Sequence, residues 1–142
     1  MAVVVEILRE PSDAAVRDLN HILPQMSHEG RLMTYEYLQK LLAASGVLAV
    51  CRDDNRIIGC AYLAIEVIPT RIKGWIEDVV VDEDYRGQGL AKQMLQLLVA
   101  EARDAGCMHV NLTSRPGRGS AQHLYGALGF GLRSTTVWRA NL

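Results

Sequence analysis

The feature that most constrains this chain is a run that passes from a strand through a glycine-rich turn into a helix. The segment Val79–Val81 consists of β-branched residues, which favour a strand over a helix. A polar turn follows, and the letters Arg-Gly-Gln-Gly-Leu-Ala of Arg86–Ala91 lead into a helix expected from about Gln88 to Ala105. The fold must therefore accommodate a strand and a long helix joined by a short glycine-containing turn.

Such a turn is suited to binding an anion. The first backbone N–H groups of a helix have no partner within the helix, and the helix dipole is positive at that end. Gly87 and Gly89 lack the side chains that would keep a phosphate away from these N–H groups. Arg86 adds a fixed positive charge with several hydrogen-bond donors. The sequence predicts a phosphate or pyrophosphate as the ligand of this turn.

Two common phosphate-binding patterns do not fit the turn. The dinucleotide fingerprint G-x-G-x-x-G/A fails because its sixth position is Lys92, and the P-loop pattern fails because Leu90 and Ala91 follow Gly89. A nucleotide-binding domain of another class is therefore disfavoured. The remaining pattern, Arg-x-x-Gly-x-Ala after a Val-Val-Val-Asp strand, resembles the acetyl-CoA signature of the GNAT superfamily of N-acetyltransferases.

Length and composition indicate one soluble domain covering residues 1–142. The net charge of −1 gives no general attraction to nucleic acid or to a membrane, and no apolar stretch is long enough to span a bilayer. The N-terminus lacks the basic region of a signal peptide, so a cytoplasmic location is expected. The three cysteines are widely spaced in apolar contexts, which indicates buried free thiols, and no Cys/His cluster has metal-ligand spacing.

The element order predicts an α+β fold with a mixed sheet. Helices are expected to begin at Ser12 or Asp13, at Thr34, near Gln88 and at Ser120. Strands are expected at Val3–Leu8, Val47–Cys51, Arg56–Ile68, the run ending at Val81, Cys107–Leu112 and Leu132–Arg139. The order β-α-α-β-β-β-α-β-α-β, with a right-handed β-α-β crossover, resembles the GNAT fold, a mostly antiparallel sheet around a β-α-β CoA-binding core with helices on both faces.

The resemblance implies a general acid for the reaction. The segment Ala121–Phe130 is similar to the family pattern A-x-x-L-Y-x-x-x-G-F, in which the tyrosine faces the thioester sulfur. This assigns Tyr125 as the acid, since a phenol stays protonated at neutral pH and can donate to a thiolate. A tyrosine that only packs on its helix is the alternative.

Two adjacent acids precede the valines of the signature strand. Neighbours on a strand point to opposite faces, so only one of Glu77 and Asp78 can face the acceptor unless a bulge intervenes. Either carboxylate could orient the amine or take its proton, and a salt bridge is the alternative role. Glu77 is the first choice. The sequence of Ile76–Val81 also locally resembles that of glucosamine-6-phosphate N-acetyltransferases.

The resemblance also implies a set of cofactor contacts. The strand backbone would pair with the pantetheine arm, and the turn would hold the pyrophosphate. The family pattern has an asparagine seven residues before the tyrosine, where this chain has Arg118, which is expected to contact phosphate instead. The candidate cofactor-binding residues are Val79, Val80, Val81, Arg86, Gly87, Gln88, Gly89, Leu90, Ala91 and Arg118.

The sequence therefore predicts an enzyme that uses acetyl-CoA, without a metal, to acetylate a primary amine of a small molecule or a protein. Direct transfer is expected, because no cysteine lies in the motif. The alternative is a non-catalytic CoA-binding sensor or interaction module with the same fold. A homodimer through the last strand and its Trp138 is possible, and neither nucleic acid nor membrane is expected as a partner.

Overall fold

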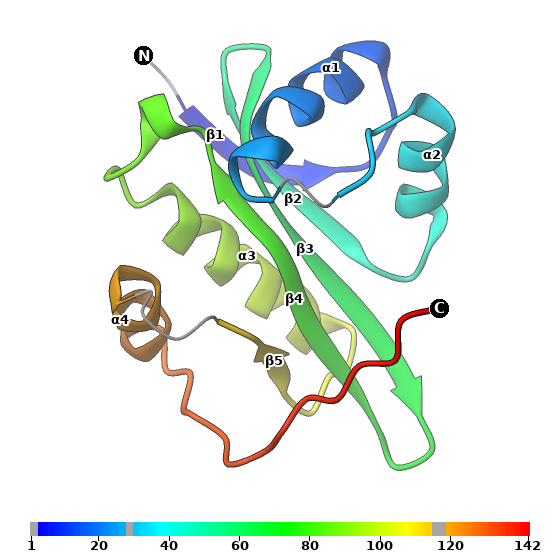
Figure 1. Cartoon of the computed structure of the whole chain (residues 1–142), viewed down its shortest axis with the longest axis vertical. Helices are drawn as coiled ribbons and strands as arrows, with labels where there is room; N and C mark the ends of the chain where they lie inside the picture. The colour runs from blue at the N-terminus through cyan, green and yellow to red at the C-terminus, as the bar shows by residue number, and fades with distance from the viewer. Residues whose placement is uncertain (1–2, 28–29, 115–118) are drawn as a thin grey trace.

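The centre of the molecule is one five-stranded sheet, in the strand order β1-β2-β3-β4-β5 (Figure 1). The computed structural model describes residues 3–27, 30–114 and 119–142. Neighbouring strands are antiparallel except for β4 and β5, which are parallel. The strands are β1 (Val3–Leu8), β2 (Val47–Asp53), β3 (Arg56–Ile68), β4 (Arg71–Val81) and β5 (Val110–Leu112). The predicted mostly antiparallel sheet and the parallel pair that a β-α-β crossover produces are both confirmed.

The helices begin where short polar side chains can cap them. The Ser12 side chain accepts a hydrogen bond from the Ala15 amide at 3.0 Å, and the Thr34 side chain accepts one from the Tyr37 amide at 3.1 Å. The helical elements are α1 (Asp13–Ile22), the short η1 (Leu23–Gln25), α2 (Tyr35–Ala43), η2 (Glu83–Tyr85), α3 (Leu90–Asp104) and α4 (Gly119–Ala127). Pro24 lies in η1, immediately after α1 ends.

The sheet separates two apolar cores. In Figure 1, α1 and α2 lie in front of the sheet and α3 lies behind it. The front core consists of Leu8, Ala15, Leu19, Ile22, Met33, Leu38, Leu48, Val50, Ile57, Cys60 and Val80. The rear core consists of Ala49, Cys51, Ile58, Ala61, Leu63, Ile76, Leu90, Met94, Leu95, Leu98 and Ala102. The prediction of an α+β fold with helices on both faces is confirmed.

A β-bulge changes the face that β4 presents to each core. Ile76 packs in the rear core, whereas Val80, four residues later, packs in the front core. In a regular strand these two residues would share a face. The pairing moves from Tyr62↔Glu77 to Cys60↔Val80, so one residue of β3 opposes two of β4. Asp78, inside this bulge, has a φ of +53°, which lies in the left-handed region.

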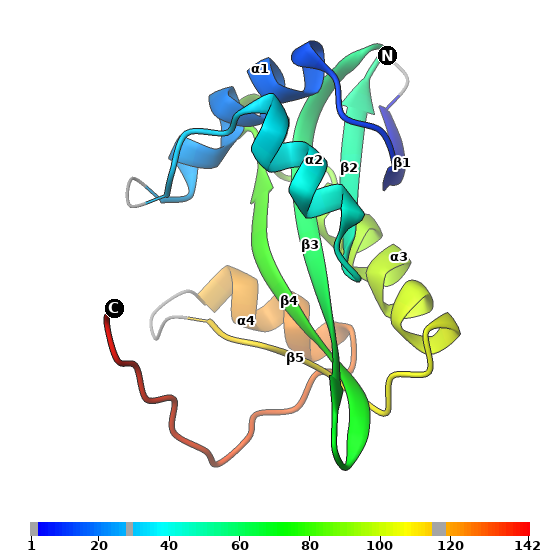
Figure 2. The same ribbon diagram turned by 90° about the vertical axis from the view of Figure 1, so that its right-hand side faces the viewer.

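The predicted last strand, Leu132–Arg139, is wrong for this chain. Residues 130–142 form neither helix nor strand, and the segment extends away from the sheet (Figure 2). A strand requires a neighbour for its backbone hydrogen bonds, and this segment pairs with no described strand. The strand expected at Cys107–Leu112 is also shorter than predicted, at Val110–Leu112.

Candidate active site

The second half of β4 has an open edge. β5 pairs with β4 only at Gly74, Trp75 and Ile76. Beyond Ile76, β4 pairs with β3 at Glu77, Val80 and Val81, and no described strand lies on its other side. Unpaired backbone groups at a sheet edge can bind an extended ligand that carries amides of its own. The bulge lies at the point where this open edge begins.

The glycine-rich turn leads from this strand to α3. Gly87 and Gly89 have φ values of +80° and +76°, a region that suits glycine. Gly89 is the N-cap of α3, and no side chain caps the first N–H groups of that helix. A Cβ added at either glycine would meet nothing within 4 Å, so the space around the turn is open. The predicted anion site therefore has accessible donors at the positive end of a 15-residue helix.

Polar contacts anchor the residues that immediately precede this turn in the sequence. The Asp82 carboxylate is 2 % exposed, accepts a hydrogen bond from the Asp84 amide at 3.0 Å and lies 3.4 Å from Nε2 of His21. The Tyr85 hydroxyl donates to the Asp53 carboxylate. These contacts tie the turn to α1 and to the β2–β3 hairpin, so its geometry is fixed before a ligand binds.

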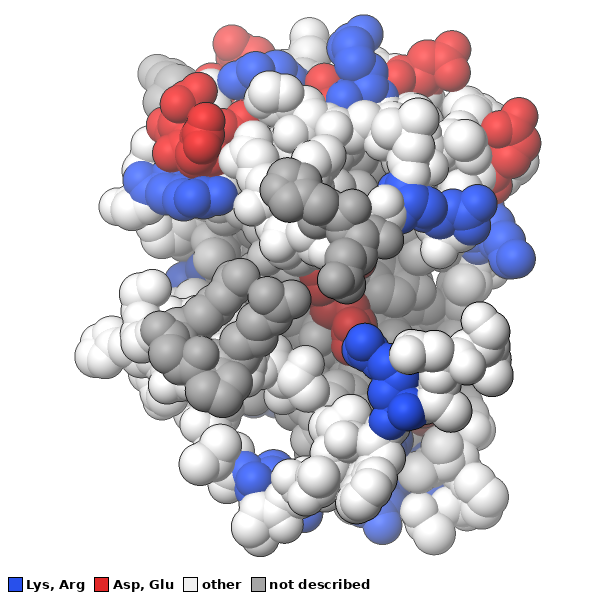
Figure 3. Space-filling view, in the orientation of Figure 1, with Lys and Arg blue, Asp and Glu red and all other residues white. Residues whose placement is uncertain are grey.

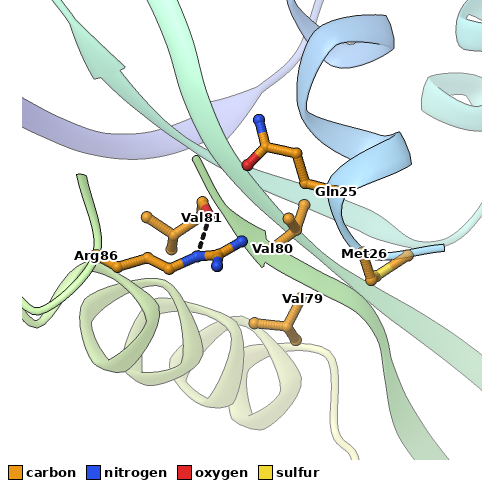
Figure 4. Close-up of a pocket in the computed structure, with 6 residues that line it drawn as sticks. All are labelled: Gln25, Met26, Val79, Val80, Val81 and Arg86. Carbon is orange, nitrogen blue, oxygen red and sulfur yellow. Dashed lines mark hydrogen bonds between the residues drawn. The ribbon is translucent and has the colours of Figure 1, made fainter. Parts of the chain in front are cut away.

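A groove of about 300 Å³ lies between η1 and the open edge of β4. Figure 4 shows Arg86 reaching across its floor, with Nε donating to the Val81 carbonyl oxygen at 3.1 Å. The groove is lined by Gln25, Met26, Val79, Val80, Val81 and Arg86. Four of the predicted cofactor-binding residues thus line one cavity.

Gln25 and Met26 were not among the predicted cofactor-binding residues. In the structure the Gln25 side-chain oxygen accepts a hydrogen bond from the Glu83 amide at 2.9 Å, which joins η1 to the turn. The contact links segments far apart in the sequence, so no local pattern could have indicated it.

Both acids of the signature strand are exposed at the bulge. A bulge, the exception to the rule that strand neighbours face opposite sides, is thus present at these residues, and which of the two acts on the amine stays a prediction. The pKa of Glu77 is raised above the usual glutamate value, firstly because its carboxyl group is partly desolvated by the surrounding protein although the residue as a whole is exposed, and secondly because of the negative charge of Asp78. In the space-filling view, acidic side chains lie in a hollow near the centre of the molecule, where β4 crosses it (Figure 3).

Tyr125 lies on α4, on the rear-core side of the sheet. It is partly buried, and its ring packs edge-to-face against Phe130, with ring centroids 6.3 Å apart. It is thus on a different element from the two acids. Arg118 lies outside the described residues. Within the described ranges, no group of three or more His, Cys, Asp or Glu side chains could hold a metal ion.

A family model described as "Acetyltransferase (GNAT) family" matches residues 13–130. The chain belongs to the GNAT family of acetyltransferases. A probable glucosamine 6-phosphate N-acetyltransferase from Drosophila melanogaster is 32% identical over 105 residues, which cover 68% of this chain and 48% of that protein. The chain spans about half the length of the curated relatives it matches.

Solved acetyltransferases share the fold along nearly the whole chain. An acetyltransferase from Trypanosoma brucei has a TM-score of 0.82 and 27% identity, covering 99% of this chain and 100% of that one. An aminoglycoside N-acetyltransferase in complex with CoA has a TM-score of 0.80 at 17% identity, covering 99% and 97% of the two chains. The predicted family and fold are therefore confirmed.

Three features of this site have the chemistry needed to hold acetyl-CoA. An open strand edge, a groove and an uncapped helix start follow one another along the chain from Glu77 to Leu90. The amides of a pantetheine arm can hydrogen-bond to the open strand edge. The negative charge of a pyrophosphate suits the helix N-terminus and Arg86. No described helix is long and apolar enough to cross a membrane.

Proposed function

We propose that this GNAT protein transfers an acetyl group from acetyl-CoA directly to a primary amine of a small molecule or a protein. The observation that carries the proposal is the bulge of β4, which presents two carboxylates beside an open strand edge and its groove. Family membership supports the same reaction.

The cofactor-binding residues divide into two groups. The backbone of Val79, Val80 and Val81 pairs with the pantetheine amides along the open edge. The turn and the first residues of α3 bind the pyrophosphate through Arg86, Gly87, Gln88, Gly89, Leu90 and Ala91. Arg118, which lies outside the described residues, is proposed as a further phosphate contact.

Two groups of this chain move protons. When bound, acetyl-CoA supplies the acetyl group as a thioester. Glu77 accepts the proton that the amine loses as the C–N bond forms, with Asp78 orienting the amine. Tyr125 donates a proton to the sulfur as the C–S bond breaks, so the thiol leaves neutral. Because the pKa of Glu77 is raised, it is a stronger base than an ordinary glutamate.

Direct transfer is supported by the state of the cysteines. Cys60 lies near the bulge, and its thiol donates to the Asp78 carbonyl oxygen at 3.8 Å. Burial raises the pKa of Cys60 to about 12, so the thiol remains protonated at neutral pH. A covalent acetyl-cysteine intermediate is therefore not part of the proposal.

The proposal is tested by calorimetric titration with acetyl-CoA, with NADH as the control ligand, followed by thiol release from acetyl-CoA with a panel of amines. Binding of acetyl-CoA alone and amine-dependent release of CoA are expected. Arg86→Gln should weaken acetyl-CoA binding by roughly 10- to 150-fold, because a charged hydrogen bond to phosphate contributes about 1.5–3 kcal/mol. Arg103→Gln, in the last turn of α3, is the matched control and should bind normally. Binding without turnover on any amine would favour the sensor alternative.

We also propose a homodimer in the cytoplasm. Residues 131–142 carry large apolar side chains that are almost fully exposed, with Trp138 at 89% and Leu132 at 104%. A second copy could cover them, since such patches often mark interaction surfaces. The free thiols of Cys51 and Cys60 suit a reducing compartment.

A further inference from the structure

A second cavity, of about 100 Å³, lies on the front side of the sheet between α1, α2 and the strands β2, β3 and β4. Its walls are mostly aliphatic, with leucines from both helices and from β2, together with Met33. Tyr37 and Tyr62 complete the wall as half-buried aromatic rings. None of these residues belongs to the groove assigned to acetyl-CoA.

The polar side chains of this cavity other than Asp78 have partners or remain neutral. The Cys60 thiol donates to the Asp78 carbonyl oxygen. Burial, followed by the neighbouring Tyr37, raises the pKa of Tyr62, so its phenol is uncharged at neutral pH. The guanidinium of Arg31 lies over the outer ring of Tyr37, 4.3 Å from its centroid. Among the residues that the structure describes, Asp78 is the one charged residue that lines the cavity.

Asp78 connects this cavity to the proposed site of proton transfer. It lies inside the bulge, adjacent in sequence to Glu77, and it is exposed while the opposite wall of the cavity is buried. A ligand entering past Asp78 would keep a cationic or polar nitrogen beside the Asp78 carboxylate, which is adjacent in the chain to Glu77. The rest of that ligand would lie against leucine, methionine and tyrosine side chains.

We propose that the acceptor is a primary amine that carries a compact, uncharged, branched aliphatic group, and that this group inserts into the cavity beyond Asp78. The inference rests on the proposed function and specifies its substrate class. The cavity, at about 100 Å³, is smaller than the about 150 Å³ that holds benzene, so it suits a branched chain of about four carbons rather than an aromatic ring. A phosphate in this cavity would be desolvated against aliphatic walls, which strongly disfavours a charged sugar phosphate there.

The first experiment compares kcat/KM for matched amines by release of the CoA thiol at fixed pH. The apolar amines are isobutylamine and isoamylamine, and the polar ones are ethanolamine, glucosamine and glucosamine 6-phosphate. Each buried methylene changes affinity about fourfold. The apolar amines should therefore exceed ethanolamine at least tenfold in kcat/KM.

The second experiment fills the cavity from α2. Leu41→Trp should raise KM for isoamylamine at least tenfold and leave ethylamine, which is too short to reach the wall, little changed. Leu42→Trp is the matched control, because Leu42 is the neighbouring, equally half-buried leucine of α2 and does not line the cavity. Circular dichroism and acetyl-CoA titration of both variants verify the fold and the cofactor site.

The outcomes separate the two proposals. A preference for apolar amines that Leu41→Trp abolishes and Leu42→Trp preserves supports the substrate class. Efficient transfer to glucosamine 6-phosphate or ethanolamine, unaffected by Leu41→Trp, overturns this inference while leaving the acetyltransferase function intact. Failure to bind acetyl-CoA and to acetylate any amine overturns the proposed function, and this inference with it.

Discussion

At the scale of single residues, the chemistry depends on how the bulge places two adjacent carboxylates. Burial is the larger cause of the raised pKa of Glu77, and the charge of Asp78 adds to it. Glu77 must be deprotonated to accept a proton, so kcat/KM should fall as pH decreases through this pKa. Glu77→Gln should remove the acidic limb of the profile and lower kcat at least a hundredfold.

The matched variant at the bulge is Asp78→Asn. Removing the neighbouring negative charge lowers the pKa of Glu77, so the acidic limb should move to lower pH while turnover is retained in part. The measurement is a pH profile of kcat/KM for the wild type and both variants. An unchanged acidic limb in Glu77→Gln would assign the base role elsewhere.

At Tyr125, the proposed catalytic role of the hydroxyl can be tested separately from the packing role of the ring. Phenylalanine preserves the edge-to-face packing on Phe130 but removes the hydroxyl proton. Tyr125→Phe should lower kcat about a hundredfold and leave the Kd of acetyl-CoA unchanged. Tyr35→Phe, at an exposed position on α2, serves as the control. Full activity in Tyr125→Phe would leave this tyrosine with the packing role alone.

At the scale of elements, the start of α3 combines binding with a conformational requirement. Gly89→Ala places a Cβ in open space, so no clash is expected, but the left-handed backbone should cost about 1–2 kcal/mol in the free energy of unfolding. Gly30→Ala is the control, because its Cβ is also unobstructed and its φ lies outside the positive range. Urea unfolding of the two variants measures the difference. Equal stabilities would mean that the turn adopts another conformation.

The elements that could be predicted from the sequence are those that depend on local signals. The caps at Ser12 and Thr34, the hairpin turn at Asp54 and the strand–turn–helix run all follow from neighbouring residues. The family resemblance then supplied the sheet topology. The groove contact of Gln25 with Glu83 and the apolar cavity behind Asp78 depend on distant segments, so no local pattern indicated them. The roles of Glu77, Asp78 and Tyr125 stay predictions.

At the scale of the whole molecule, residues 131–142 contain the one expected strand that did not form. The segment Leu132–Arg139 has the alternating pattern of a strand, yet it lies away from the sheet in the rotated view (Figure 2). The outer edge of β5 is also unpaired among the described strands. A partner chain that adds this segment to β5 would satisfy both the backbone groups and the exposed apolar side chains.

This arrangement predicts a dimer that depends on the C-terminal segment. The 15.7 kDa chain should elute at twice its mass in size-exclusion chromatography with light scattering. The double substitution Val137→Asp with Trp138→Asp should give a monomer, because it places two charges in the contact. Val67→Asp is the matched control, since Val67 is an apolar side chain with a similar exposure, 78% against 71% for Val137, on the β3–β4 hairpin. A wild-type chain that is monomeric at every concentration would show that the segment has no partner in a second copy.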